Sequence, residues 1–256
     1  ARLGAEVRFF GAVGRDAFGD ELVAGLRAEN INTGEVLRVN EGSGCALICV
    51  DHHGENAIAV LPGANALAPL PPPDLKGELL LQLEVPLATN VAWAQAAAAH
   101  AIPVMLNAAP MVELPRELLA AVQVLVVNEG ELAAMVGPEF DLRHDTPDGQ
   151  HAALDAALAH AAAQGPQRVV VTLGERGCRA WDEGRVIAWP AVQVPVVDTT
   201  GCGDAFVGAL AASLAEGLQF DAALKRATVA AGLSCRLPGA RAGMPRKGQL
   251  ASAMST

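Results

Sequence analysis

The stretch Asp198-Thr199-Thr200-Gly201-Cys202-Gly203-Asp204, which we call the anion loop, joins an apolar run at residues 192–197 to a helical pattern at residues 205–216. The apolar run predicts a strand. A strand, a tight loop with two glycines and a helix start together predict an anion site, because the first N–H groups of a helix lack intrahelical partners and the helix dipole is positive there. The glycines are expected to let this backbone come close to an anion.

An acid, Asp204, lies at the mouth of this predicted anion site. A carboxylate there can take the proton of a hydroxyl that attacks a phosphoryl group. Taken alone, Asp204 could equally be the N-cap of the helix, and the glycines could serve a tight turn. The joint pattern of two acids six positions apart around Thr-Thr-Gly-Cys-Gly favours the functional interpretation. Cys202 adds a thiol at the helix start, where thiols react readily.

Strand-like and helix-like segments alternate through the rest of the chain. Strands are predicted at residues 7–13, 79–84, 104–107, 124–128 and 169–173, and helices at residues 17–29, 89–100, 115–122, 129–136 and 151–164. The alternation predicts an α/β fold, a single domain over residues 1–256 with a mainly parallel sheet covered by helices on both faces. In the first helix, Phe18, Leu22 and Leu26 share one face, and Asp16 is its predicted N-cap.

Two hairpins interrupt this alternation. One pairs residues 44–51 with residues 56–61 around a His52-His53-Gly54-Glu55 turn, and the other pairs residues 177–182 with residues 185–189. The first hairpin, within about residues 36–61, predicts a flap or lid, because a hairpin inserted into an α/β domain often covers a site. The two histidines favour an exposed turn over a metal site, since no third ligand is near in the sequence.

Polar residues end most of the predicted strands. In an open parallel sheet, ligands bind beyond the carboxyl ends of the strands, so these residues predict a cleft along one sheet edge. They are Glu84, Asn107, Asn128, Thr172 and Asp198.

The anion loop resembles the C-terminal signature of the ribokinase-like carbohydrate kinases, the phosphofructokinase-B family. Gly4 and Gly14 resemble the end of that family's N-terminal signature. Further segments resemble ribokinases within the family: Gly63-Ala64-Asn65, Gln82-Leu83-Glu84, Asn107-Ala108-Ala109-Pro110, Asn128-Glu129-Gly130-Glu131 and Thr172-Leu173-Gly174-Glu175-Arg176-Gly177. The resemblance implies a three-layer αβα sandwich with a small β-sheet lid, incomplete here. It also implies transfer of a phosphoryl group from ATP to a sugar hydroxyl, with ribose as the first candidate.

The resemblance also implies roles for residues of the anion loop and for Glu84. Asp204 is the expected catalytic base, and the backbone N–H groups of Gly201, Cys202 and Gly203 are the expected anion hole. Glu84 and Asp204 are expected to bind the sugar. From the residues alone, Glu84 could also be a solvated strand end.

Nucleotide and metal roles follow from the same resemblance. The expected nucleotide-binding residues are Asn128, Thr172, Gly174, Gly177 and Thr228. Thr228 departs from the His or Asn common there, and a turn would equally explain the glycines. Asn128 and Glu131 are expected in the outer shell of Mg²⁺, although the same pair predicts a helix capping box. The expected ligands of a monovalent cation, K⁺, are Asp198, Thr200, Ser234, Leu237 and Gly239; we call residues 234–240 the cation loop, which could also simply end a helix.

Composition excludes other classes of partner. The net charge of −10 argues against nucleic acid and against anionic membrane surfaces, and no apolar run approaches the length of a membrane span. Five cysteines without C-x-x-C spacing predict a reducing cytoplasm and no zinc site. A homodimer through the lid is also compatible with the resemblance.

Rival functions fit the motifs less well. A dinucleotide-dependent oxidoreductase would need G-x-G-x-x-G after an early strand, whereas Phe206 occupies the third glycine position of a late loop. A P-loop NTPase would need G-K-[ST], which is absent. A non-catalytic nucleotide- or sugar-binding protein has no need of Asp204. Fructokinase-, ketodeoxygluconate kinase- and adenosine kinase-like substrates stay open within the kinase class.

The resembled family begins with a strand that carries a sugar-binding Asp and continues through one arm of the lid, whereas this chain starts at Ala1 after that segment. We therefore expect the sequence to be a fragment, short by about 35–45 residues. Such a fragment is expected to bind ATP weakly and to phosphorylate sugar poorly.

Overall fold

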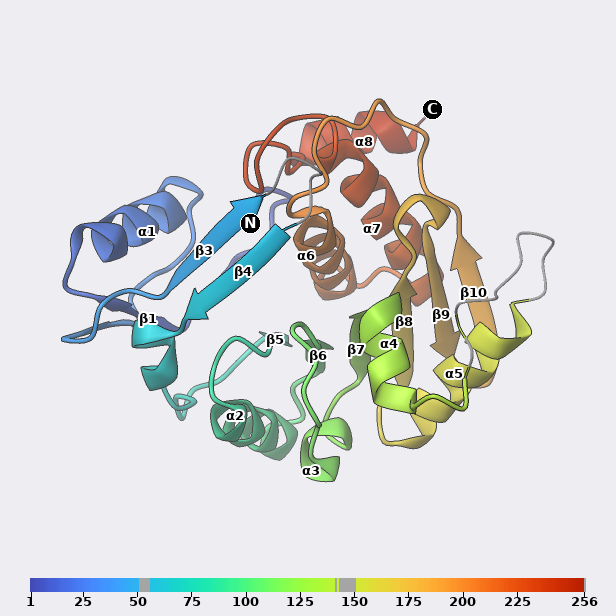
Figure 1. Ribbon diagram of the computed structural model, residues 1–256, viewed down its shortest axis with the longest axis horizontal. Coiled ribbons are helices and arrows are strands. Elements are labelled where there is room, and N and C mark those ends of the chain that lie inside the picture. Colours follow the sequence, from blue (N-terminus) through green and yellow to red (C-terminus); the bar gives the residue numbers. More distant parts are fainter. Residues whose placement is uncertain (51–55, 141, 143–150, 256) are drawn as a thin grey trace. The chain divides into compact units, whose positions relative to one another are not determined.

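The computed structural model describes residues 1–50, 56–140, 142 and 151–255 (Figure 1). The chain divides into two compact units. The first unit comprises Ala1, Glu6–Pro73 and Glu84–Trp93, and the second comprises Arg2–Ala5, Asp74–Leu83 and Ala94–Thr256. The anion loop and the cation loop both belong to the second unit.

The first unit contains two small sheets. Its elements are β1 (Gly11–Gly14), α1 (Ala17–Ala28), β2 (Val36–Val39), β3 (Cys45–Val50), β4 (Asn56–Leu61) and the short 3₁₀ helix η1 (Gly63–Leu67). Strands β1 and β2 are parallel, whereas β3 and β4 are antiparallel with Cys45 opposite Leu61. The predicted hairpin is therefore confirmed, and its His52-His53 turn lies outside the described residues.

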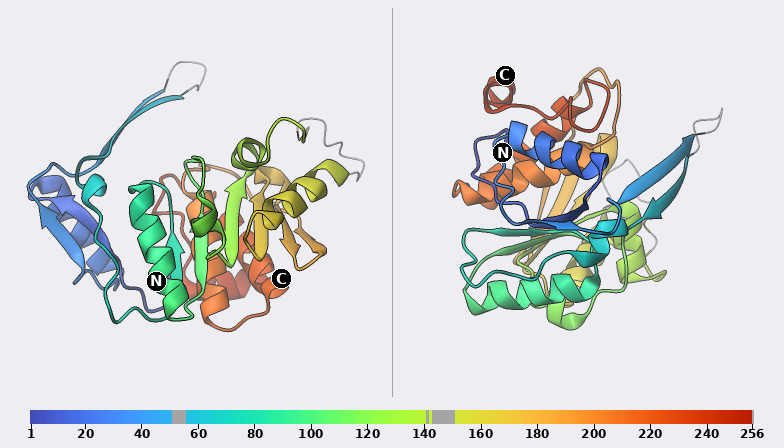
Figure 2. Two further views of the ribbon diagram at one scale, coloured as in Figure 1. Left: turned by 90° about the horizontal axis from the view of Figure 1, so that it is seen from below. Right: turned by 90° about the vertical axis from the view of Figure 1, so that its left-hand side faces the viewer.

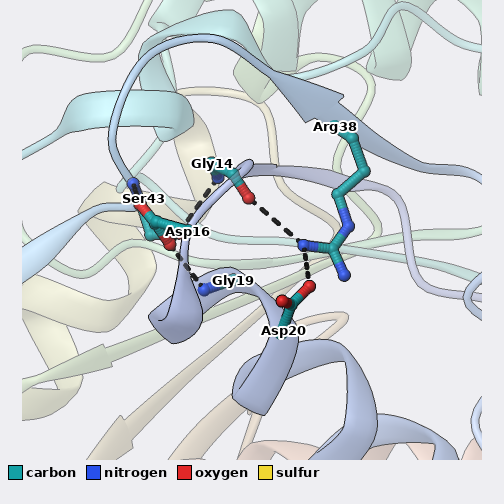
Figure 3. Close-up of polar contacts among 6 residues, drawn as sticks. All are labelled: Gly14, Asp16, Gly19, Asp20, Arg38 and Ser43. Atoms are coloured by element: carbon teal, nitrogen blue, oxygen red, sulfur yellow. Dashed lines mark hydrogen bonds and ion pairs between the residues drawn. The ribbon is translucent and has the colours of Figure 1, made fainter.

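Asp16 organises the first unit around the start of α1 (Figure 3). Its Oδ1 accepts a hydrogen bond from the Gly19 N–H at 2.8 Å, which confirms the predicted N-cap. Its Oδ2 accepts the Ser43 N–H at 2.7 Å, and the Ser43 hydroxyl bonds Oδ1 at 2.7 Å while accepting the Gly14 N–H at 3.0 Å. The backbone hydrogen bonds from Ser43 and Gly19 lower the pKa of Asp16. One carboxylate thus joins α1 to the segment that enters β3.

Phe18, Leu22 and Leu26 do share one face of α1, but this face is not the one that packs against the sheet. Phe18 is 68% exposed and Leu22 41% exposed, whereas Gly19 and Val23 are the buried residues of this helix. Helix α1 instead packs against β1 through the face that carries Gly19 and Val23, which are four positions apart. The helix can approach the Gly14 carbonyl closely because Gly19 has no side chain.

The second unit is built on one six-stranded sheet. Its elements are β5 (Leu79–Leu81), α2 (Leu87–Ala99, which starts in the first unit), β6 (Val104–Asn107), α3 (Arg116–Leu119), β7 (Val124–Asn128), α4 (Glu129–Val136), α5 (Ala152–Ala163), β8 (Arg168–Thr172), η3 (Gly174–Arg176), β9 (Cys178–Asp182), β10 (Arg185–Trp189), α6 (Cys202–Ala215), α7 (Phe220–Ser234) and α8 (Lys247–Met254). The strand order is β10-β9-β8-β7-β6-β5. Strands β5 to β8 are parallel, and β9 and β10 are antiparallel.

Helices lie on both faces of this sheet (Figure 2). Val124, Val126 and Val170 belong to the buried core that includes residues of α6, α7 and α8. On the other face, α4 contacts β7, and α5 contacts β8 and β9. Burial of both faces explains why these strands are apolar throughout, and the predicted α/β sandwich is confirmed in this unit. Among the described residues, no helix has the length and apolarity that crossing a membrane requires.

The strand predicted at residues 192–197 is not formed. The N–H groups of Val197 and Asp198 donate instead to the Cys235 carbonyl, at 2.8 and 3.2 Å, just beyond α7. Val196 and Val197 are 64% and 60% exposed, so this apolar segment does not enter the sheet. The anion loop therefore follows a connection that is held by the end of α7, rather than a strand.

Candidate functional site

Helix α6 begins three residues earlier than predicted, at Cys202, with Gly201 as its N-cap. Gly201 has φ +78°, and a Cβ there would lie 2.8 Å from the Ala240 carbonyl oxygen. This position thus needs glycine both for its backbone conformation and for its contact with the cation loop. Since Gly201 is the cap, the interpretation of Asp204 as N-cap is wrong; Asp204 is the third residue of the helix.

The start of α6 has backbone donors that no backbone acceptor in the described residues satisfies. The Cys202 N–H donates to the Thr199 carbonyl at 3.1 Å, and the Ala205 N–H donates to the Gly201 carbonyl at 2.9 Å. Across the described part of the chain, no acceptor pairs with the N–H groups of Gly201, Gly203 or Asp204. A Cβ built on Gly203 would meet no atom within 4 Å. The site therefore has donors and room for an anion, with Cys202 the least available of the three predicted donors.

Asp204 lies in the first turn of α6 and is exposed. Partial desolvation of its carboxyl group nevertheless raises the pKa of Asp204 above the ordinary value. The nearby positive end of the helix dipole favours the charged form, so desolvation and the dipole act in opposite directions. A carboxylate with a raised pKa beside unpaired N–H groups has the character of a general base at an anion site.

Asp198 connects the anion loop to the cation loop. Its Oδ2 accepts the Gly239 N–H at 2.7 Å, and its Oδ1 accepts the Thr200 N–H at 2.9 Å. These hydrogen bonds, that from Gly239 first, lower the pKa of Asp198 to about 2. Three of the five predicted cation ligands are thereby brought together.

The other two predicted cation ligands are placed differently. Ser234 is 3% exposed, and its hydroxyl oxygen lies 2.7 Å from the Ala231 carbonyl oxygen and 3.2 Å from Cys202 Sγ. Leu237 is 51% exposed on the cation loop. Only backbone carbonyls of such residues could serve a cation, which agrees with the hard-cation chemistry expected there.

Sequence reasoning missed Cys235, the C-cap of α7. Its carbonyl holds Val197 and Asp198, and its thiol interacts with that of Cys202. Burial, and next the neighbouring Cys202, raise the pKa of the Cys235 thiol to about 11. No local pattern points to Cys235, because its partners are distant in the sequence.

Asn128 and Glu131 form the predicted capping box at the start of α4. Asn128 Oδ1 accepts the Glu131 N–H at 2.8 Å, and Glu131 Oε2 accepts the Asn128 N–H at 2.7 Å. Desolvation raises the pKa of Glu131, although its hydrogen bond with Asn128 acts the other way. Glu129 of the same turn pairs with Arg176 of η3. A structural role is thus confirmed, and a role near Mg²⁺ stays a prediction.

The turn after β8 contains Thr172, Gly174 and Gly177. Thr172 Oγ1 lies 3.4 Å from the Val127 carbonyl oxygen, and the Leu173 N–H donates to the Gly177 carbonyl at 2.8 Å. Gly174 and Gly177 have φ of +58° and +91°. A Cβ on Gly177 would clash with the Trp189 carbonyl, whereas one on Gly174 would meet nothing within 4 Å. The turn is built on glycine conformation, with open space only at Gly174.

Thr228, predicted beside the adenine, is 6% exposed. Its hydroxyl donates to the Leu224 carbonyl at 2.9 Å and lies 3.3 Å from Cys178 Sγ. With its only proton engaged inside the core, Thr228 has none to donate to a base in this arrangement.

Glu84 belongs to the first unit, in the bend after β5, and its role toward a sugar stays a prediction.

No group of three or more His, Cys, Asp or Glu residues that could hold a metal ion occurs among the described residues.

Comparisons with known proteins match almost the entire chain. The model of the pfkB family carbohydrate kinases matches residues 1–247. A ribokinase from Bacillus subtilis is 32% identical over 262 residues, covering 100% of this chain and 84% of the relative. The structure of Arabidopsis thaliana ribokinase complexed with ribose and ATP is similar with a TM-score of 0.86 at 28% identity, covering 100% of this chain and 84% of that one. Ribokinase from Cryptococcus neoformans var. grubii serotype A in complex with ADP has a TM-score of 0.86 at 29% identity, covering 98% and 84%.

Proposed function

This chain belongs to the pfkB family of carbohydrate kinases, and we propose that it transfers the γ-phosphoryl group of ATP to a sugar hydroxyl, with ribose as the first candidate and O5 as the acceptor atom. The observation that carries the proposal is the start of α6. Within the described part of the chain the N–H groups of Gly203 and Asp204 have no backbone acceptor, a Cβ position at Gly203 meets no atom within 4 Å, and the Asp204 carboxylate belongs to the same turn. The relatives named as ribokinases support ribose as the first sugar to test.

In the proposed reaction, Asp204 accepts the proton of the sugar hydroxyl as that oxygen attacks the γ-phosphorus, and ADP leaves. The N–H groups of Gly201 and Gly203 donate to the transferring phosphoryl group, and that of Cys202 joins them if it releases Thr199. Such preorganised donors stabilise charge where it develops in the transition state. Raised by desolvation, the pKa of Asp204 makes this carboxylate a better proton acceptor than an ordinary Asp.

Two cations fit the chemistry of the donor set. Mg²⁺, when bound, would neutralise charge on the ATP phosphates, and Asn128 and Glu131 are the residues that would hold it in its outer shell. K⁺ fits the oxygen atoms of Asp198, Thr200, Ser234, Leu237 and Gly239. Asn128, Thr172, Gly174 and Gly177 are the proposed nucleotide contacts, and the buried Thr228 would contribute through its packing with Cys178 rather than through a hydrogen bond to the base. Cytoplasmic location and a homodimer through the lid hairpin are further proposals.

A coupled assay of ADP release tests this function. Purified protein with MgATP and K⁺ is given ribose, fructose, ketodeoxygluconate or adenosine, and a reaction without sugar measures ATP hydrolysis alone. We expect the largest kcat/KM with ribose. A larger value with another acceptor would reassign the substrate, and ATP binding without sugar-dependent ADP release would favour the non-catalytic binding protein.

A further inference from the structure

Two cysteines meet where α6 begins and α7 ends. Cys202 is the first residue of α6, and Cys235 is the C-cap of α7. The two helices pack against each other in the second unit (Figure 1). Both thiols are free and partly buried.

Several contacts fix the positions of the two thiol groups. The Cys202 sulfur lies 3.2 Å from the hydroxyl of Ser234, the residue next to Cys235. The Cys235 sulfur lies 3.3 Å from the Ala231 carbonyl oxygen, which also accepts the Ser234 hydroxyl at 2.7 Å. Both residues also bracket the same backbone, since Cys202 Sγ approaches the Asp198 carbonyl at 4.0 Å and the Cys235 carbonyl accepts the Asp198 N–H. Cys202 therefore packs against the residue next to Cys235, and both thiols belong to one small cluster around Ser234 and the Ala231 carbonyl.

We propose that Cys202 and Cys235 form a reversible disulfide bond, with a small-molecule disulfide as the oxidant, and that this bond inactivates the anion loop. The Cys202 thiolate attacks one sulfur of the oxidant, so that a mixed disulfide forms and one small thiolate leaves. The Cys235 thiol then loses its proton and attacks the Cys202 sulfur, releasing the second small thiolate. Two electrons pass from the cysteine pair to the oxidant, and both small thiolates take up the protons that the cysteines lose.

The position of this bond makes it a control on phosphate binding. Cys202 directly precedes Gly203 and Asp204, whose N–H groups have no backbone acceptor among the described residues. A disulfide would pull Cys202 toward the end of α7 and remove its contact with Ser234, so the first turn of α6 would shift. In reducing compartments, disulfide bonds are usually transient and serve redox sensing or catalysis rather than stability.

Oxidation followed by peptide mapping tests the proposal. The native protein is incubated with oxidised glutathione, and free thiols, cysteine-linked peptides and kinase activity are measured before and after dithiothreitol. We expect two of the five thiols to disappear together and a peptide pair joining Cys202 to Cys235. We also expect a roughly 10- to 100-fold fall in kcat, because small displacements of catalytic groups cost that much, and recovery on reduction.

Two variants sharpen the result. Cys235→Ala is expected to form no internal link, because its resolving thiol is gone, and to show the same kcat before and after treatment with dithiothreitol. Cys45→Ala removes an exposed thiol of the first unit and should respond like the native protein. Absence of the linked peptide in native protein overturns the proposal, as does a linked protein with unchanged kcat. The thiol count and the mapping need no catalysis, so their failure is distinct from a failure of the proposed kinase function, on which only the loss of kcat rests.

Discussion

The carboxylate of Asp198 accepts the Gly239 N–H at 2.7 Å, so one side chain joins the anion loop to the cation loop. Its other oxygen accepts the Thr200 N–H at 2.9 Å. The backbone around the proposed phosphate site is thus fixed by a charge, and this charge is present only while Asp198 is ionised.

Asp198→Asn should lower the melting temperature and weaken ATP binding. In the native protein each carboxylate oxygen accepts one backbone N–H, from Gly239 and from Thr200. An asparagine has only one oxygen, so its amide nitrogen would be placed against one of these two donors. The pKa of Asp198 is lowered from 3.8 to about 2 on folding, so its stabilisation is full above pH 3.8 and is lost as the pH falls toward 2. Unfolding of both proteins as a function of pH measures this. A stability difference that does not shrink below pH 3.8 would contradict the assignment.

Gly201→Ala and Gly203→Ala should have different consequences. Gly201 has φ +78° and a Cβ position 2.8 Å from the Ala240 carbonyl oxygen, so its substitution should destabilise the fold by about 1–3 kcal/mol. Gly203 has open space and no positive φ, so its substitution should spare the fold but crowd the phosphate and raise the KM for ATP. Denaturant unfolding and kinetics separate the two effects.

Gly208→Ala is the matched control for that pair, since it lies within α6 with nothing within 4 Å of a Cβ. It should leave KM unchanged and the fold equally or more stable. Equal effects of Gly201→Ala and Gly203→Ala on stability would refute the distinction between them.

The sequence predicts the sandwich well because strand and helix periodicities are local. Residues 124–136 show this best, since the apolar run, the Asn128 cap and Glu131 three positions later together define β7, the turn and α4 as observed. The start of α6 was harder to place, because two glycines compete for the cap and only the φ of Gly201 decides between them.

Features that depend on distant partners were not predictable. The apolar residues 192–197 satisfy every local rule for a strand, yet Val197 and Asp198 pair with the Cys235 carbonyl. The neighbourhood of Cys202 and Cys235 has the same origin. The offset face of α1 depends on the approach of Gly19 to β1, which hydrophobic spacing does not encode.

Asp16→Ala should loosen the entry to β3. The change removes the N-cap of α1 and both contacts with Ser43. We expect faster hydrogen exchange at the Gly19 and Ser43 amides and a melting temperature lower by a few degrees. Asp20→Ala is the control, because it removes an exposed ion pair with Arg38 and a first-turn acid of the same helix but leaves the contacts with Ser43 in place. Unchanged protection of the Ser43 amide in Asp16→Ala would show that this network does not hold the segment.

Replacement of K⁺ by tetramethylammonium at constant ionic strength should lower kcat/KM. The bulky cation cannot approach the oxygen atoms expected to bind K⁺ between the anion and cation loops, so the positive charge beside the phosphate site would be lost. Titration of K⁺ at fixed Mg²⁺ and ATP measures the effect, and Asp198→Asn should diminish it. Identical rates in the two salts would exclude a functional cation there.

Asp204→Asn should reduce kcat by about 10²–10⁴-fold, the usual contribution of a general base, while ATP still binds. The fold should change little, because Gly201 rather than Asp204 caps α6. Desolvation raises the pKa of Asp204 in the folded state, so the free energy of unfolding falls as the pH rises through that pKa and the carboxyl group ionises. The substitution removes this penalty, which offsets the favourable interaction of the carboxylate with the helix dipole that is lost at the same time. The native enzyme should lose kcat/KM as acid protonates Asp204, with a midpoint above that of an ordinary Asp. Single-turnover kinetics, ATP titration and thermal unfolding of both proteins provide the test, and a variant with near-native turnover would remove Asp204 from the mechanism.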